Sequence, residues 1–179
     1  MKLEVKSPEI PHPRDEVYAA LVDPVVLARL LPGVEKFTET GPDQYAVEVK
    51  LGVGAIKGNY QGSIELFDRT PPEGYKLRGD AKGGPGWARG EAQFRLESSE
   101  SGGTHVIASA DTQVGGAIAG VGQRMMEGVA KSMAQEFFVA VGRELEGQAP
   151  QAQPLGFGLR VLWRTVCAFF AKLFGGSKT

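Results

Sequence analysis

Cysteine and histidine are scarce in this chain of 179 residues, which contains one Cys and two His. A single cysteine excludes a disulfide framework, and Cys167 lies in an apolar run where it is typical of a small hydrophobe. His12 and His105 are far apart and stand in no metal-ligand pattern. Zinc-hydrolase, nucleophile-elbow and phosphate-loop motifs are also missing. The sequence therefore contains few candidate catalytic residues.

An excess of charge of either sign is missing as well. Lys and Arg number 20 and Asp and Glu 21, for a net charge of −1. This balance argues against nucleic acid as a partner, because phosphate binding needs a basic surface. The first eight residues contain no apolar run typical of a signal peptide. We therefore expect the protein to stay in the cytoplasm.

Acidic residues are absent from the last part of the chain, which follows a Gln-, Ala- and Pro-rich stretch at 147–156 that we interpret as a flexible linker. Residues 157–174, placed on a helix at about 100° per residue, separate into a broad apolar face and a cationic face. Such a helix is typical of segments that lie in a membrane interface. We predict that it holds the protein peripherally at the cytoplasmic side of the inner membrane and that residues 175–179 form a disordered end. The predicted membrane-binding residues are Leu159, Arg160, Leu162, Trp163, Arg164, Val166, Phe169, Phe170, Lys172, Leu173 and Phe174.

Two other interpretations of residues 157–174 remain open. The apolar face would also suit packing on the chain's own domain or on a partner protein. The segment also fits a single membrane span, since its 18 residues lie at the short end of the roughly 17–25 needed. Arg164 would then stand near mid-span at a cost of about 2.5–3.5 kcal/mol, which favours the in-plane helix.

Residues 1–146 have the length of one globular domain. The pattern predicts a strand at 2–10, helices at 13–21 and 24–31, and then strands with period-two alternation. Those strands are expected at 34–39, 45–53, 56–68, 74–81, 88–97 and 104–114. Short turns rich in Gly, Pro and Asp between them indicate an antiparallel meander.

A long helix is predicted at 117–146. Apolar residues recur every four positions from Val121 to Leu145. This stripe has to be buried against the only large surface available, the concave face of the sheet. A strand, two short helices, a curved antiparallel meander and one long gripped helix form an α+β helix-grip fold. Here a separate amphipathic tail helix is expected to follow it.

Several segments resemble, in order, the landmarks of one protein family. Asp23–Glu35 is similar to its helix followed by a Pro-Gly-Cys-Glu turn, with Val in place of the Cys. Ala88–Ala92 and Gly116–Met126 resemble a strand and the entry to its last helix, and Phe137–Phe138 matches its paired aromatics. Over about residues 1–146 the chain thus resembles the carbon monoxide dehydrogenase CoxG family, which belongs to the START-like, polyketide-cyclase (SRPBCC) superfamily. The resemblance implies the helix-grip fold and, as a partner, a molybdenum CO dehydrogenase or related hydroxylase.

The predicted strands are rich in glycine, which costs stability and leaves space. Such glycines mark either bends in the sheet or a cavity between sheet and helix. The long helix carries methionines, whose flexible side chains adapt to irregular apolar shapes. We therefore predict an apolar cavity for a hydrophobic small molecule, without a metal or a catalytic group. Its predicted lining residues are Leu27, Leu30, Leu31, Val47, Val49, Leu51, Ile64, Leu77, Phe94, Met125, Met126, Val129 and Met133.

Three functions are compatible with these residues. The first is a non-enzymatic carrier that takes a lipid-soluble molecule from the bilayer; the family context favours an isoprenoid quinone, menaquinone or ubiquinone, carried between membrane and dehydrogenase. The second is a membrane anchor or assembly factor for that dehydrogenase, without ligand transfer. The third is a cyclase or dehydratase like some START-like relatives, with Tyr60, Tyr45 and Asp111 as candidate acid–base groups on inward faces.

Overall fold

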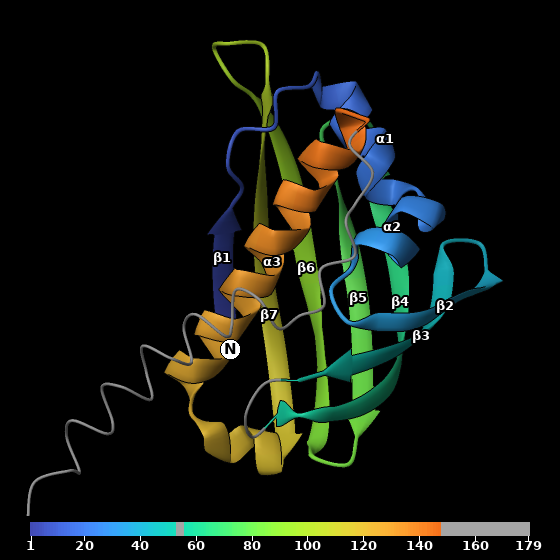
Figure 1. Cartoon of the computed structure of the whole chain (residues 1–179), viewed down its shortest axis with the longest axis vertical. Coiled ribbons are helices and arrows are strands. Elements are labelled where there is room, and N and C mark those ends of the chain that lie inside the picture. The colour runs from blue at the N-terminus through green and yellow to red at the C-terminus, as the bar shows by residue number, and fades with distance from the viewer. Residues whose placement is uncertain (53–55, 148–179) are drawn as a thin grey trace, which may run out of the picture.

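The computed structural model describes residues 1–52 and 56–147, and these form a sheet with helices packed on one side (Figure 1). Most of the predicted linker and the whole predicted membrane-binding helix lie outside the described residues. In chain order the elements are β1 (Lys2–Lys6), α1 (Arg14–Val22), α2 (Pro24–Leu30), β2 (Val34–Gly41), β3 (Gln44–Leu51), β4 (Gly58–Thr70), β5 (Gly74–Gly83), β6 (Gly86–Ser98), β7 (Thr104–Gly116), the 3-10 helix η2 (Ala117–Val121) and α3 (Gln123–Leu145).

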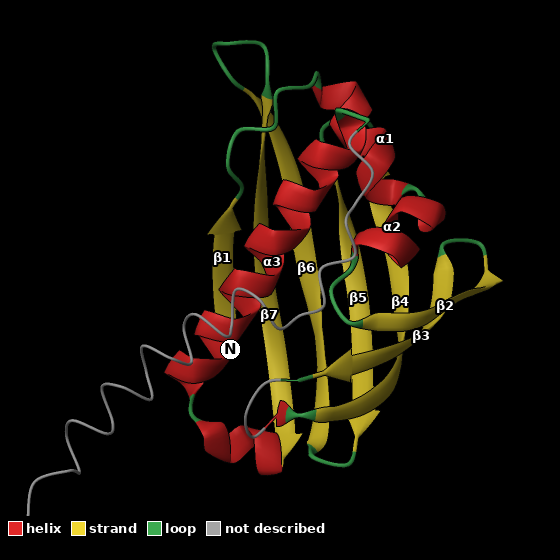
Figure 2. Ribbon diagram, in the orientation of Figure 1, coloured by secondary structure: helices red, strands yellow, loops and turns green. Residues whose placement is uncertain are grey.

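The seven strands form one antiparallel sheet in the order β1-β7-β6-β5-β4-β3-β2. Strands β2 to β7 follow one another as a meander, and β1 pairs with β7 at the far edge. The sheet is curved, and α1, α2 and α3 all lie on its concave side (Figure 2). The predicted helix-grip fold is therefore confirmed.

The short helices begin close to the predicted positions. The side-chain oxygen Oδ1 of Asp23 accepts hydrogen bonds from the backbone N–H groups of Val25 at 2.7 Å and Val26 at 3.3 Å. Pro24 occupies the first position of α2, where its missing N–H and fixed φ do no harm. These local groups set the start of α2, which lies with α1 at one end of the sheet (Figure 1).

The hydrophobic core is concentrated at the end of the sheet that carries α1 and α2. The second half of α3 contributes Phe137, Phe138 and Val141, which form one cluster with residues such as Leu21 of α1 and Leu96 of β6. No residue of α3 before position 134 belongs to this cluster. The long helix is therefore held against the sheet mainly through its second half.

The long helix is interrupted near its start. We predicted one helix from 117 to 146, whereas Ala117–Val121 is a 3-10 helix and α3 begins at Gln123. Between them Gly122 has φ 92° and ψ 141°, a conformation that glycine adopts readily and an α-helix cannot contain. The continuous helix was a wrong prediction, because the apolar periodicity runs across this break.

Strand ends also differ from the prediction. β1 ends at Lys6 rather than at Ile10, since Pro8 has no N–H to donate to a ladder. Ile10 alone returns to the sheet, where it exchanges backbone hydrogen bonds of 2.9 and 2.8 Å with Thr104. β4 begins at Gly58, two residues later than predicted.

Two glycines allow neighbouring strands to approach more closely than other residues permit. A Cβ added to Gly62 of β4 would lie 1.9 Å from the carbonyl oxygen of Asp80, and one added to Gly90 of β6 would lie 2.3 Å from that of Asp111. Such distances are far inside van der Waals contact. The course of the sheet therefore requires glycine at both positions.

Replacing Gly90 by Ala should destabilise the protein, because the new methyl group meets the backbone of β7. We expect the free energy of unfolding to fall by about 1–3 kcal/mol, as is usual for backbone strain. Gly128, on α3 with open space around its Cα, provides the control: Gly128→Ala should stabilise by up to about 1 kcal/mol. Urea unfolding measures both changes, and a Gly90→Ala variant as stable as the wild type would contradict the close approach.

Candidate functional site: an apolar hollow on the concave face

Small residues occupy the middle of the concave face. Residues opposite one another in antiparallel strands share a face, and the pairing of β4 to β7 brings these small residues together in adjacent rows. The residues are Gly62, Gly79, Ala81, Ala88, Gly90, Ala92 and Ala110. They form a floor, called here the Gly/Ala floor, that rises little above the backbone.

A hollow of about 290 Å³ lies over the Gly/Ala floor. Val47 and Val49 of β3, Ile64 of β4 and Leu77 of β5 border it, and Thr112 of β7 lies at its other side. Charged residues of these strands contribute to the lining, but strand alternation turns their side chains to the opposite face. Among the described residues, Thr112 is therefore the one polar side chain that the register directs into this lining.

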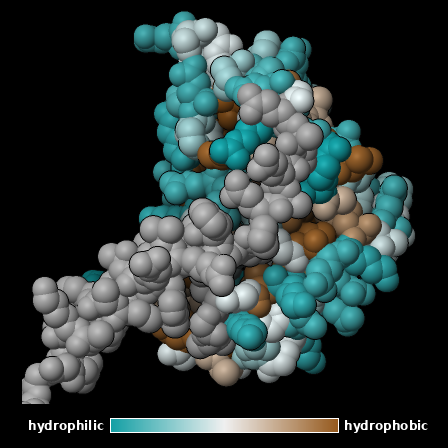
Figure 3. All heavy atoms as spheres, viewed as in Figure 1, coloured by the Kyte–Doolittle hydropathy of each residue, from teal (hydrophilic) through white to brown (hydrophobic). Residues whose placement is uncertain are grey.

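The hollow is open rather than enclosed. No residue of α3 belongs to its lining, although α3 crosses the same side of the sheet (Figure 2). Figure 3 shows apolar surface between α2 and strands β2 and β3, where a separate depression is lined by residues such as Val25 and Phe37. In the part of the chain that the structure describes, the floor is therefore accessible from the concave side.

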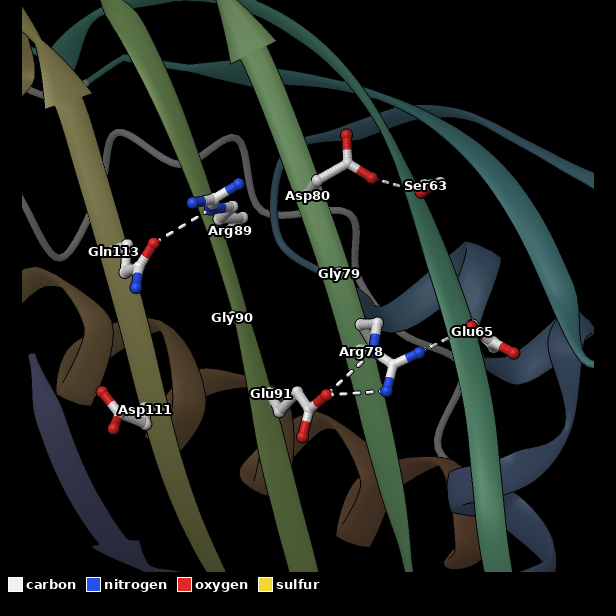
Figure 4. Close-up of a pocket in the computed structure, with 10 residues that line it drawn as sticks. All are labelled: Ser63, Glu65, Arg78, Gly79, Asp80, Arg89, Gly90, Glu91, Asp111 and Gln113. Atoms are coloured by element: carbon white, nitrogen blue, oxygen red, sulfur yellow. Dashed lines mark hydrogen bonds and ion pairs between the residues drawn. The ribbon is translucent and has the colours of Figure 1, made fainter.

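A second depression, of about 540 Å³, lies on the opposite face of the sheet (Figure 4). It is larger, but its side chains already pair with one another. Arg78 lies 3.7 Å from Glu65 and 2.8 Å from Glu91, and Arg89 donates to Gln113 at 3.0 Å. Exposed, mutually satisfied ion pairs are typical of the solvated face of an antiparallel sheet. The smaller apolar hollow is therefore the candidate site.

Asp111 lies on this outer face (Figure 4). Its carboxylate pairs with the amino group of Met1 at 3.4 Å. The interpretation of Asp111 as an inward acid was wrong, because its neighbour Thr112 has the inward register. Trp87 also faces outward, because it alternates with Ala88 of the floor along β6: its ring covers Gly115, and the Arg89 guanidinium lies 5.4 Å from the ring centroid.

All four tyrosines of the chain are buried. Tyr60 donates its hydroxyl to the carbonyl of Ile56 at 2.8 Å. Tyr75 stacks on Phe94 with ring centroids 4.7 Å apart, and meets Tyr18 edge-on at 6.2 Å. Burial raises the pKa of every one of these phenols above its ordinary value. At neutral pH they are uncharged, so none of them brings a negative charge to the hollow.

The structure separates the predicted ligand-binding residues into several groups. Val47, Val49, Ile64 and Leu77 line the hollow, and two of them, Ile64 and Leu77, also pack against the core. The residues that lie in or against the packed core instead are Leu27, Leu30, Leu31 and Phe94. Met125 on α3 is 47% exposed. The remaining predicted residues are half-buried: Leu51, Met126, Val129 and Met133. A role in ligand binding stays a prediction for all of them.

The residues of the Gly/Ala floor are absent from the predicted lining. The prediction looked for large apolar side chains, whereas a hollow is created where side chains are small. The signal was present in the sequence, because small residues alternate at positions 79 and 81 and again at 88, 90 and 92. Two such alternations in neighbouring strands predict a shallow floor.

Within residues 1–52 and 56–147, no group of His, Cys, Asp or Glu is arranged to hold a metal ion. No helix of that part is long and apolar enough to cross a membrane. Two buried polar atoms there, the Tyr18 hydroxyl and Nδ1 of His105, have no hydrogen-bond partner.

Known structures define the class of this fold. Zhui aromatase/cyclase from Streptomyces sp. R1128 matches with a TM-score of 0.61 and 16% identity over 87% of this chain and 99% of that one. A conserved protein from Geobacillus kaustophilus matches with a TM-score of 0.73 and 32% identity over 82% of this chain and 93% of that one. The chain is thus a START-like, helix-grip protein.

The family follows from the sequence. The model of the CoxG family, named for a carbon monoxide dehydrogenase subunit, matches residues 7–146, while no curated protein matches. The chain belongs to the CoxG family, as its motifs predicted. Family and fold together suggest an accessory role in which a hydrophobic ligand is bound.

Ionisation of the tyrosines should be coupled to unfolding. Phenols of the unfolded chain ionise at about pH 10, whereas burial keeps the folded phenols protonated above it. Above about pH 10 the folded state therefore binds more protons than the unfolded state, and the free energy of unfolding falls as pH rises. A spectrophotometric titration should show little phenolate until circular dichroism reports unfolding. Phenolate from all four tyrosines at about pH 10 in folded protein would contradict their burial.

Proposed function

We propose that this protein is a membrane-associated, non-enzymatic carrier that binds a respiratory quinone and couples a molybdenum CO dehydrogenase-type hydroxylase to the membrane. The observation that carries the proposal is the open hollow over the Gly/Ala floor. Its side chains offer apolar contact and almost no polar groups. Such a surface suits a molecule that is dissolved in lipid rather than in water.

The size and shape of the hollow favour a ring as the bound group. At about 290 Å³ it lies near the low end of the roughly 300–1,000 Å³ of small-molecule pockets. Gly79, Ala81 and Gly90 leave a floor without large side chains across neighbouring strands. The ring of menaquinone or ubiquinone could lie against this floor, while the isoprenoid chain leaves by the open side.

Family membership supports the proposed partner. The family takes its name from a subunit of carbon monoxide dehydrogenase. Electrons released by such an enzyme need an acceptor, and quinones of the respiratory chain are dissolved in the bilayer. A carrier that moves the quinone ring between bilayer and enzyme would connect the two.

The sequence of residues 157–174 supports the proposed location at the cytoplasmic side of the inner membrane. Its apolar residues would enter the interface, and Arg160, Arg164 and Lys172 would face anionic headgroups. Each basic residue at an anionic leaflet contributes about 1 kcal/mol. The predicted linker would let the domain turn between membrane and partner.

The likeness to an aromatase/cyclase raises the alternative of catalysis on a ring-bearing substrate. Acid–base catalysis needs titratable groups within reach of the substrate. Thr112 does not titrate, and Asp111 faces away from the hollow. The phenols of Tyr45 and Tyr60 have raised pKa values because they are buried, which disfavours them as bases. The carrier is therefore the function that the hollow supports best.

Filling the hollow should weaken ligand binding. Ala81→Leu places a larger side chain on the Gly/Ala floor, and we expect affinity for menadione, a short naphthoquinone, to fall at least tenfold, or about 1.4 kcal/mol. Thermal stability should be unchanged or higher, since the added carbons enter open space. Lys82→Leu is the matched control, because Lys82 follows Ala81 on β5 and faces the other side. Calorimetric titration compares them; equal affinity of Ala81→Leu and wild type would exclude the hollow as the site.

Deletion of residues 155–179 should release the protein from membranes. All the residues of the described core precede position 148, so the domain should keep its thermal unfolding temperature. Cell fractionation measures the distribution of the two forms. Replacing Lys178 alone by Ala should shift the distribution much less than the deletion, because it removes one of the four basic residues of 155–179 and none of the apolar ones. Retention of the deletion variant in the membrane fraction would contradict the proposed role of this segment.

A further inference from the structure

The hollow and the last part of the chain are complementary in chemistry. The hollow is apolar and open, and the helices of the described part leave it uncovered. Residues 155–174 contain Trp163, Phe169 and Phe170 on their predicted apolar face. Aromatic and aliphatic side chains of this size are driven out of water. Away from a membrane, they need another apolar surface.

The two parts are also complementary in charge. The whole chain has a net charge of −1, and residues 155–179 contain four basic residues and no acid. Residues 1–154 therefore carry a net charge of −5. This difference attracts the basic segment to its own domain, most strongly at low ionic strength.

The chain length allows the contact. α3 has 23 residues, so about 17 Å separate its middle from its C-terminal end at 1.5 Å per residue. The predicted linker at 147–156 spans about 18 Å as a flexible coil. The segment that follows can therefore return beside α3 to the open concave face.

The volume decides how much of the segment can enter. A hollow of about 290 Å³ is far smaller than a helix, so only a single side chain of the segment can enter it. One aromatic side chain has about this size. Trp163 is the largest candidate, and it lies near the middle of residues 157–174.

We propose that, away from the membrane, residues 155–174 dock on the concave face of their own chain and place Trp163 in the hollow. The proposal rests on the proposed function for the identity of the competing ligand. The docked segment and a quinone ring exclude one another. The hollow thus becomes free for loading when the segment transfers to the bilayer, where the quinone is dissolved.

A single tryptophan can report the docked state. The chain has two Trp, and Trp87 lies on the outer face, so Trp87→Phe leaves Trp163 alone without altering the hollow. The full-length variant is labelled with 5-fluorotryptophan and observed by fluorine NMR in buffer without lipid or detergent. We expect one resonance displaced from its position in urea and unchanged by tenfold dilution.

A pair of substitutions and two added substances test what covers Trp163. Ala81→Leu should move the resonance at least halfway toward its position in urea, whereas Lys82→Leu should leave it in place. Menadione should move it with the same concentration dependence as menadione binding. Vesicles containing anionic phospholipid should move it to a third position.

Three results would overturn the proposal: a resonance at the urea position in plain buffer, a resonance insensitive to Ala81→Leu, or a position that changes on dilution. The last would show that a second copy covers the segment. Menadione binding with an exposed Trp163 would refute the docking and leave the carrier standing. A docked Trp163 in protein that, even with residues 155–179 deleted, binds no menadione would refute the carrier and leave the docking.

Discussion

The hollow depends on the packing of α3 against the sheet at one end only, the end that carries α1 and α2. The buried residues of α3 that make this contact are Phe137, Phe138 and Val141. Apolar burial stabilises roughly in proportion to area, at about 25 cal/mol per Å². The aromatic pair supplies such area. The Gly/Ala floor supplies little, so nothing draws the first half of α3 down onto it. The open space is thus a consequence of where large and small residues stand in the strands.

The two faces of the same strands differ in polarity. Along β5, for example, Gly79 and Ala81 belong to the floor, whereas Arg78 and Asp80 lie on the outer face. The outer face holds ion pairs such as Arg78 with Glu91, which contribute little stability individually but keep that face soluble. The period of two in the sequence therefore places polar side chains on the solvent-exposed outer face and apolar ones on the concave face. Gly62 and Gly90 have a second effect besides keeping the floor low. They permit the close approach of neighbouring strands.

Much of this architecture can be predicted from the sequence. Alternation identified the meander, and the Asp23-Pro24 pair identified the start of α2. Other features could not be predicted for physical reasons. Apolar periodicity does not reveal that Gly122 takes a positive φ, so the break before α3 was missed. Nor does it distinguish a packed strand residue such as Phe94 from one that lines open space such as Val49, since both alternate in the same way.

The sequence also does not settle on which face of the sheet a single strand residue lies. A shift of one position in β7 exchanges Thr112 and Asp111 between the faces, and with them the chemistry assigned to the hollow. Pairing with β6 resolves this, because Thr112 lies opposite Gly90 and Asp111 opposite Glu91. The hollow that results has no charged side chain of the described residues directed into its lining. A carrier of lipid-soluble rings is consistent with that surface.

The most direct test of the account is the content of the hollow in protein purified from membranes that contain quinone. Solvent extraction followed by mass spectrometry should yield close to one isoprenoid quinone per chain, and much less from Ala81→Leu. Protein that is empty, or that carries phospholipid in place of quinone, would contradict the central claim.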